Sequence, residues 1–437
     1  MYRNYLSASL LFTVLGLAAA PAQAEWKIYK FLDVGVAATD DLQLVLGEEV
    51  IYSVRPSVEL AFKGNRFDHE IIGEVEVFRF GERGDDIVDG RLSLNTNGTL
   101  VQEFLFVSSS LDIAKVLPGD DFFDLTENTE TQGRFKFNPF ISRQIGQIAD
   151  LFVGYSHQSL DDEFDGDIET TQNNLNFSLR RNPSFGGIIW SVGGNYERSR
   201  VSDDDFEQDF DSKSIFGSLG HTVGQTTFFE VITGREQNDI TEFGTQEESA
   251  AFYEARLHWT PSERTTMTFG FSDRFFGEGP TFSLDHRVRN SILSASWTRD
   301  INNTDVSLGE VSPFAGDTDS PVPTIDTGFT DDLATDDLLF IAEQFRFGYK
   351  LAGLRSDLII DAVYSDQEEL EGEATRSELL GRIAFDRRLS SLTTLRLQYE
   401  HRVEEDIDGV TDNENRIGVR LLYNFDRKER VSIIDDQ

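Results

Sequence analysis

The segment Asn415–Phe425 reads NRIGVRLLYNF, and its residues alternate in polarity. A period of two predicts a β-strand with one apolar face and one mostly polar face. The apolar residues occupy every second position: Ile417, Val419, Leu421, Tyr423 and Phe425. The stretch is long for a strand of a soluble sheet, and it ends in two aromatic residues at spacing two. Two interpretations follow: the closing strand of a β-barrel, or an ordinary edge strand of a soluble sheet.

The same strand resembles the assembly signal that closes outer-membrane β-barrels, which has a polar residue, a glycine two positions later and then hydrophobic residues. The positions that carry the resemblance are Arg416, Gly418, Leu421, Tyr423 and Phe425. The resemblance implies that the barrel assembly machinery recognises this strand. Such barrels often end at the aromatic residue itself, whereas a charged tail, residues 426–437, follows here.

The first 24 residues have the pattern of a secretory signal peptide. Arg3 precedes a mainly apolar run over residues 6–20, and Ala22-Gln23-Ala24 is a small-x-small cleavage site. The apolar run is too short for a spanning helix. The predicted organisation is a signal peptide over residues 1–24, an outer-membrane β-barrel over residues 25–425, and a short periplasmic tail over residues 426–437.

Composition narrows the class of protein. The chain has 437 residues and no Cys, so a disulfide framework is impossible. Its 36 Phe, within an aromatic content of 12%, suit a lipid-facing surface with aromatic belts. A formal net charge of −39 argues against a nucleic-acid partner.

Segments that alternate in polarity recur along the whole chain, each about as long as a tilted barrel strand. They predict an all-β, transmembrane antiparallel β-barrel of about 20 strands, with a range of 16 to 20. The predicted strands lie near 26–38, 49–63, 66–80, 87–97, 99–114, 130–143, 148–159, 170–181, 188–200, 212–222, 226–237, 249–260, 265–276, 280–288, 290–300, 338–350, 356–365, 374–385, 393–402 and 415–425.

The connections between these segments alternate between two kinds. Short ones are rich in Gly, Pro, Asn or basic residues, such as Gly64-Asn65, Asn97-Gly98 and Thr260–Arg264. The others are usually longer and acidic, such as Asp203–Asp211 and Glu404–Glu414. Short turns on one rim and long loops on the other are typical of a transmembrane barrel. The short turns and both termini are therefore expected in the periplasm.

Two further stretches resemble a protein family. One is Asp33–Val77, in which DVGVAATDDLQL precedes a VRPSVEL strand. The other is Leu257–Ile301, which runs from LHWTPSERTTMTFGFSDRFFG to SLDHRVRNSILSASWTRDI. They are similar to outer-membrane β-barrel proteins associated with the exosortase/PEP-CTERM exopolysaccharide system. The resemblance implies a barrel that serves exopolysaccharide export or surface assembly, with polysaccharide export components as partners. It implies no catalytic residue, because the family has no established reaction.

Metal and catalytic motifs are weak. Asp161, Glu163, Asp165 and Asp167 alternate like ligands of a calcium loop, with a glycine at the sixth position. Gln172 stands where such a loop needs a bidentate Glu. One alternative is that these are solvated hairpin loops without a metal site. Another is that many acidic loops bind Ca²⁺ or Mg²⁺ loosely, bridging lipopolysaccharide or an acidic polymer. The six histidines lack metal-ligand spacing, and no nucleophile is paired with a base.

Basic residues recur on the parity that would face the inside of the barrel. They are Arg134, Lys136, Arg256, Arg346, Lys350, Arg382, Arg396, Arg402, Arg416 and Arg420. A basic lining would favour anions in a pore. The alternative is that these residues pair with lumen carboxylates such as Glu254 and Glu400 and stiffen the wall.

The sequence thus predicts a non-enzymatic channel or scaffold in the outer membrane of a Gram-negative bacterium, in contact with lipid and lipopolysaccharide. The alternatives are a general diffusion porin and, more weakly, an outer-membrane enzyme. No cofactor is expected. The long segment Ile301–Asp337 is either a constriction that folds into the barrel or a surface loop.

Overall fold

A computed structural model describes residues 25–39, 49–80, 86–116, 130–162, 169–181, 188–202, 207–242, 244–274, 277–303, 339–369, 375–405 and 411–425. Twenty β-strands occupy this part of the chain. They are β1 Glu25–Thr39, β2 Glu49–Lys63, β3 Phe67–Phe80, β4 Asp86–Val101, β5 Leu105–Val116, β6 Glu130–Ile145, β7 Ala149–Asp162, β8 Glu169–Arg181, β9 Ile188–Ser202, β10 Glu207–Val223, β11 Thr227–Glu242, β12 Gly244–Ser262, β13 Thr265–Arg274, β14 Gly277–Val288, β15 Ser291–Asn303, β16 Leu339–Ala352, β17 Ser356–Glu369, β18 Thr375–Arg388, β19 Thr393–Glu405 and β20 Thr411–Asn424.

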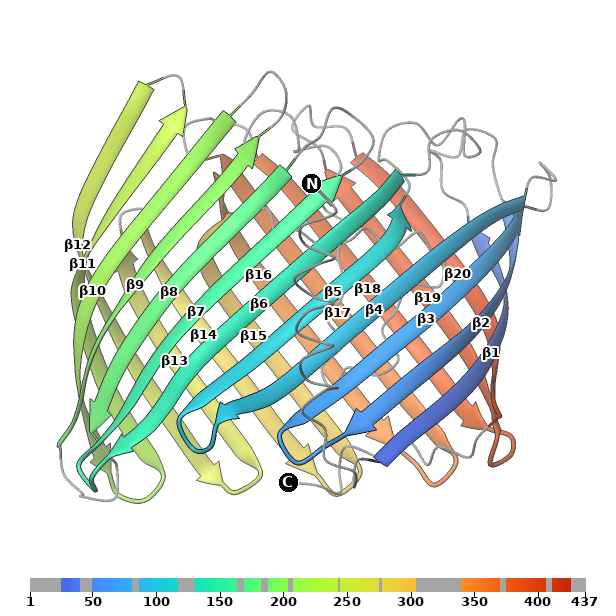
Figure 1. The fold of residues 1–437 in the computed structure, drawn as a ribbon, viewed down its shortest axis with the longest axis horizontal. Helices are drawn as coiled ribbons and strands as arrows, with labels where there is room; N and C mark the ends of the chain where they lie inside the picture. Colours follow the sequence, from blue (N-terminus) through green and yellow to red (C-terminus); the bar gives the residue numbers. More distant parts are fainter. Residues whose placement is uncertain are drawn as a thin grey trace.

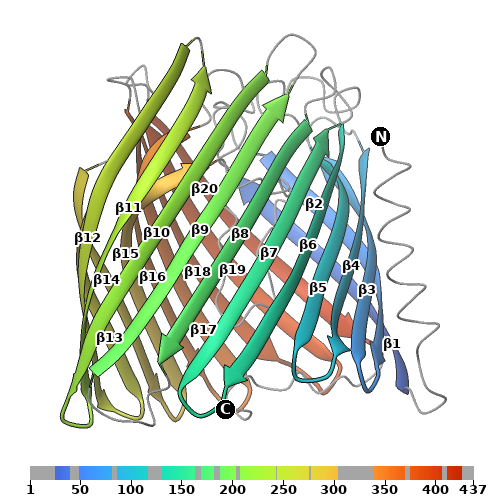
Figure 2. The ribbon, with the colours of Figure 1, turned by 60° about the vertical axis from the view of Figure 1, so that its left-hand side comes forward.

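The strands form one closed barrel. Each strand pairs antiparallel with its neighbours in sequence, and β1 pairs with β20 over Phe31–Thr39 and Arg416–Asn424. Figure 1 and Figure 2 show the tilted strands arranged around a common axis, and we call the inside of this closed wall the lumen. Closure leaves no unpaired edge strand, which is how a sheet can satisfy its backbone in a hydrocarbon environment. The predicted fold class and strand number are confirmed, and the stretch that begins at Asn415 is the closing strand.

Short hairpin turns gather at one end of the barrel, at the bottom of Figure 1. We call it the short-turn end; β1 begins there and β20 finishes there, because Glu25 is opposite Lys63 and Asn424 is opposite Phe31. The predicted turn at Gly64-Asn65 lies here. Of the predicted turn Thr260–Arg264, only Glu263-Arg264 forms the turn, because β12 continues to Ser262.

The predicted turn at Asn97-Gly98 is wrong. Both residues lie within β4, and the turn comes at residues 102–104, where Glu103 has a φ of 59°. Gly98 instead accommodates an aromatic ring, since a Cβ there would lie 2.1 Å from Cδ1 of Phe67. A glycine required for packing therefore had the sequence pattern of a glycine required for a turn.

One face of the wall carries exposed apolar side chains. Directly paired residues of neighbouring strands share a face, so the register carries this assignment around the barrel. The outward-facing residues include Val54, Val77, Leu175, Phe177, Ile215, Leu219, Val231, Tyr253, Phe271, Ile383, Tyr399 and Ile417, each more than one-third exposed. The opposite parity faces the lumen and is mostly polar.

The four tryptophans lie on the outward parity. Trp26, Trp190 and Trp259 are near the short-turn end, and Trp297 lies in mid-strand, where its Nε1 donates a hydrogen bond to Glu343. In the part of the chain that the structure describes, no helix is long and apolar enough to cross a membrane. The expected signal peptide, tail and most of the segment Ile301–Asp337 lie outside the described residues.

Candidate functional site

The lumen face gathers the basic residues that the sequence singled out. The register gives all ten the inward parity. Arg382, Arg396, Arg402, Arg416 and Arg420 come together on three adjacent strands, β18, β19 and β20. The other five are distributed over β6, β12 and β16. The arginines are therefore concentrated on one side of the lumen, beside the seam between β20 and β1.

Carboxylates on the same face pair with these arginines. Arg396 makes two hydrogen bonds of 2.7 Å to Asp386, and Arg382 donates from Nη2 to Asp361 at 3.0 Å. Arg402 bridges Glu378 at 2.7 Å and Glu404 at 2.9 Å. Further pairs join Arg416 to Glu414 at 2.6 Å, Arg376 to Glu404, Arg420 to Asp33 at 2.5 Å and Arg55 to Asp33 at 3.3 Å. We call these thirteen residues the charged wall.

Burial explains why the pairs are needed. Asp33, Asp361 and Glu378 are at most 5% exposed, as are Arg376 and Arg420. A buried ion that lacks a partner costs several kcal/mol, so each guanidinium needs an acceptor within hydrogen-bond range. The pairing neutralises most of the positive charge that the arginines would otherwise present to an anion.

Two of the remaining basic positions also have polar neighbours. On β12, Arg256 donates from Nη2 to Glu254 at 2.7 Å. On β16, Arg346 donates from Nε to Gln344 at 2.8 Å. These contacts join residues two positions apart on one strand, so they stay within the inward face.

Uncharged polar side chains line much of the opposite part of the lumen, where β6 also carries Arg134 and Lys136 on the inward face. Ser156 donates to Asn138 at 2.5 Å, Asn138 donates to Ser108 at 3.4 Å, and Asn176 donates to Asn174 at 3.5 Å. Hydroxyls of Ser191 and Ser218 lie 2.6 Å apart. We call these seven residues, on β5 to β10, the neutral wall. Its amides and hydroxyls can both donate and accept hydrogen bonds.

Three phenylalanines lie next to the neutral wall on the same inward face. Phe106 stacks on Phe140 with 5.0 Å between ring centroids, and Phe140 stacks on Phe152 at 5.8 Å. The excess of Phe in the sequence predicts a lipid-facing surface, whereas these three rings lie on the inward face. The parity of β6, on which Phe140 alternates with outward Pro139 and Ile141, was the available signal.

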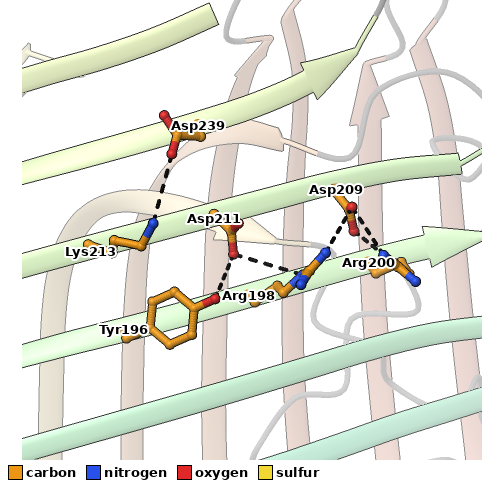
Figure 3. Close-up of polar contacts among 7 residues, drawn as sticks. All are labelled: Tyr196, Arg198, Arg200, Asp209, Asp211, Lys213 and Asp239. Atoms are coloured by element: carbon orange, nitrogen blue, oxygen red, sulfur yellow. Dashed lines mark hydrogen bonds and ion pairs between the residues drawn. The ribbon is translucent and has the colours of Figure 1, made fainter. Parts of the chain in front are cut away.

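The outer face carries a network of charges beyond the apolar band (Figure 3). Arg200 and Arg198 both bind Asp209, at 2.8 and 3.1 Å, and Tyr196 donates to Asp211 at 3.0 Å. On these strands the network lies on the side of Ile215 away from the short-turn end, so we place it outside the membrane-spanning segments. The hydrogen bond from Arg200 lowers the pKa of Asp209, and this outweighs the opposing effect of its desolvation.

Most histidines are bound to a polar residue directly opposite on the next strand. Examples are His69 with Thr96 at 2.9 Å and His258 with Thr268 at 3.1 Å. Within the described ranges, no group of three or more His, Cys, Asp or Glu could hold a metal ion. Of the candidate calcium ligands, Asp161 is the penultimate residue of β7, and Glu163, Asp165 and Asp167 lie outside the described residues.

Comparisons with known proteins identify the fold. No family model matches the chain. No curated protein matches it by sequence. Among solved structures, the apoprotein form of the FrpB iron transporter from Neisseria meningitidis is 9% identical, with a TM-score of 0.51 over 94% of this chain and 82% of that chain. The siderophore receptor PirA from Pseudomonas aeruginosa is 7% identical, with a TM-score of 0.45 over 91% and 80% of the two chains. At 9% identity the likeness to the FrpB structure is one of fold alone.

Proposed function

We propose that the protein is an outer-membrane channel or scaffold through which a polysaccharide passes during export or surface assembly. The observation that carries the proposal is the chemistry of the two lumen walls. Arginines of the charged wall are neutralised by carboxylates, and the neutral wall offers amides and hydroxyls. A lumen of this kind favours an uncharged or weakly charged solute with many hydroxyl groups over a small inorganic anion.

The proposed location is the outer membrane of a Gram-negative bacterium. Its support is the apolar outer face of the closed barrel, which would be costly to expose to water and suits lipid. Lipid and lipopolysaccharide are then the immediate neighbours, and the short-turn end is in the periplasm. The resemblance of Asp33–Val77 and Leu257–Ile301 to exosortase-associated barrels supports export components as partners.

A planar-bilayer recording of the refolded barrel tests the proposal. The expected result is weak discrimination between K⁺ and Cl⁻, because carboxylates neutralise the arginines of the charged wall, and a reduction of the current by a linear neutral oligosaccharide. Strong anion selectivity without any effect of oligosaccharide would overturn the proposal. Conductance that is weakly selective but unaffected by oligosaccharide would favour the alternative, a general diffusion porin.

A further inference from the structure

Three aromatic rings form a continuous surface inside the barrel near the short-turn end. Phe106 is the second residue of β5, Phe140 is near the end of β6 and Phe152 is near the start of β7. Phe106 and Phe140 are stacked, with 16° between their planes, and Phe140 and Phe152 with 28°. These rings belong to three successive strands and share the inward parity.

The surface remains accessible from the lumen. Phe152 is 36% exposed, and Phe106 and Phe140 are half-buried. The residue opposite Phe140 is Gly154, where a Cβ would lie 2.9 Å from the Phe152 ring. The missing side chain allows the Phe152 ring to lie against β7 beside Phe140. Exposed rings on the inner face do not contribute to a lipid-facing belt.

Hydrogen-bonding groups line the adjacent row of the same face. Asn138 precedes Phe140 by two residues, and Ser108 and Ser156 are directly opposite Asn138 on the two neighbouring strands. Residues two apart on a strand are separated by about 6.6 Å. This is on the scale of one sugar ring, so a ring lying on Phe140 would bring its hydroxyls to the amide of Asn138.

We propose that Phe106, Phe140 and Phe152, with Asn138 and Ser156, form a carbohydrate-binding platform. A pyranose has an apolar face of C–H bonds, which stacks on an aromatic ring, and a rim of hydroxyls that need hydrogen-bond partners. The platform offers both surfaces side by side. It rests on the proposed function of the lumen and adds where a saccharide first binds: at the short-turn end, the periplasmic side in the proposed orientation.

Saturation-transfer NMR and calorimetry on the full barrel in micelles would test the platform, with maltohexaose and cellopentaose as probes. Phe140→Leu and Phe152→Leu keep apolar volume but remove the ring face, and we expect each to weaken binding of the preferred probe about three- to tenfold. Phe140→Tyr keeps the ring and should retain binding. Phe137→Leu, on the outer face of the same strand, is the matched control and should bind as wild type.

The outcomes separate this inference from the proposed function. Binding by the wild type that is lost in both Leu variants supports the platform even if the barrel conducts no ions. No binding of either sugar by the folded wild type overturns it, whatever the conductance. Equal binding by the wild type and both Leu variants also overturns it. Loss of binding in Phe137→Leu as well would assign the effect to the fold of β6, and that result too would overturn the inference.

Discussion

Arg420 on the last strand and Asp33 on the first form an ion pair across the seam that closes the barrel, with 2.5 Å between Nη2 and Oδ2. Arg420 is 3% exposed and Asp33 is 5% exposed. Asp33 also accepts Arg55 from β2 at 3.3 Å, so one carboxylate joins three consecutive strands around the barrel. The two ends of a chain of more than 400 residues are thereby joined by side chains as well as by the backbone ladder.

Breaking the seam pair should destabilise the folded barrel. Arg420→Met leaves Asp33 one guanidinium, whereas Asp33→Asn removes the carboxylate shared by buried Arg420 and part-buried Arg55, so we expect the larger loss for Asp33→Asn. Removing one partner of a buried pair costs about 3–5 kcal/mol. Urea unfolding of the barrel in lipid vesicles measures the free energy of unfolding of each variant. As a control, Arg198→Gln, in an exposed pair, should cost about 0–1 kcal/mol. A larger loss in this control than in Asp33→Asn would contradict the argument.

The aromatic pair at the end of β20 should matter for assembly. Tyr423 and Phe425 pack edge to face at 4.8 Å, and the Phe425 amide donates to the Lys30 carbonyl of β1 at 3.0 Å. Tyr423→Ala with Phe425→Ala should reduce heat-modifiable barrel in outer membranes and increase periplasmic degradation. Tyr399→Ala, an exposed outward tyrosine on β19, is the control. An unchanged yield of folded barrel in the double variant would count against an assembly role for the closing strand.

Two substitutions, one in the turn at residues 102–104 and one in the strand before it, should change the stability of the barrel in opposite directions. Glu103 has a positive φ, which glycine adopts without strain, so Glu103→Gly should stabilise the barrel by up to about 1 kcal/mol. Gly98→Ala should destabilise it, because the new methyl would overlap the Phe67 ring. Unfolding midpoints measure both. A stabilising Gly98→Ala would show that the ring moves aside freely.

The outer network should weaken only in acid. The pKa of Asp209 is lowered in the folded protein, so its contribution to stability is complete above its ordinary value of 3.8 and is lost as the pH falls through the folded pKa. Hydrogen-exchange protection of the ends of β9 and β10 should be constant from about pH 5 to 8 and decrease below about pH 4. Asp209→Asn should remove this decrease in protection at low pH. If the decrease persists in Asp209→Asn, it arises from another carboxylate.

Labelling of intact cells tests the orientation. A tag at Asp205, between β9 and β10, should be accessible from outside, whereas a tag in the segment Thr260–Arg264 should not. The reason is that β9 finishes and β10 begins at the end of the barrel opposite the short-turn end. The same tags in permeabilised cells control for exposure of the epitope. The reverse pattern would place the short-turn end at the cell surface.

Strand prediction succeeded where the signal is local. The range predicted for β2, residues 49–63, agrees with the structure at both ends. Strand prediction failed in β4, because Asn-Gly is a turn signal and only the Phe67 ring on the neighbouring strand β3 explains Gly98. The inward position of the basic residues could be predicted from the sequence, but their partners could not, and the stacked lumen phenylalanines Phe106, Phe140 and Phe152 were missed.

By itself, the sequence determined the class of fold, a strand number of about 20 and the alternation that assigns most side chains to one face of the wall. A period of two is written into consecutive residues, and the apolar parity fixes which face turns outward. The tertiary structure alone decided that Asp33 meets Arg420, and that Phe106, Phe140 and Phe152 form one surface. The physical reason is that such contacts depend on strand register and on closure of the barrel. These place residues side by side that the chain separates by up to hundreds of positions.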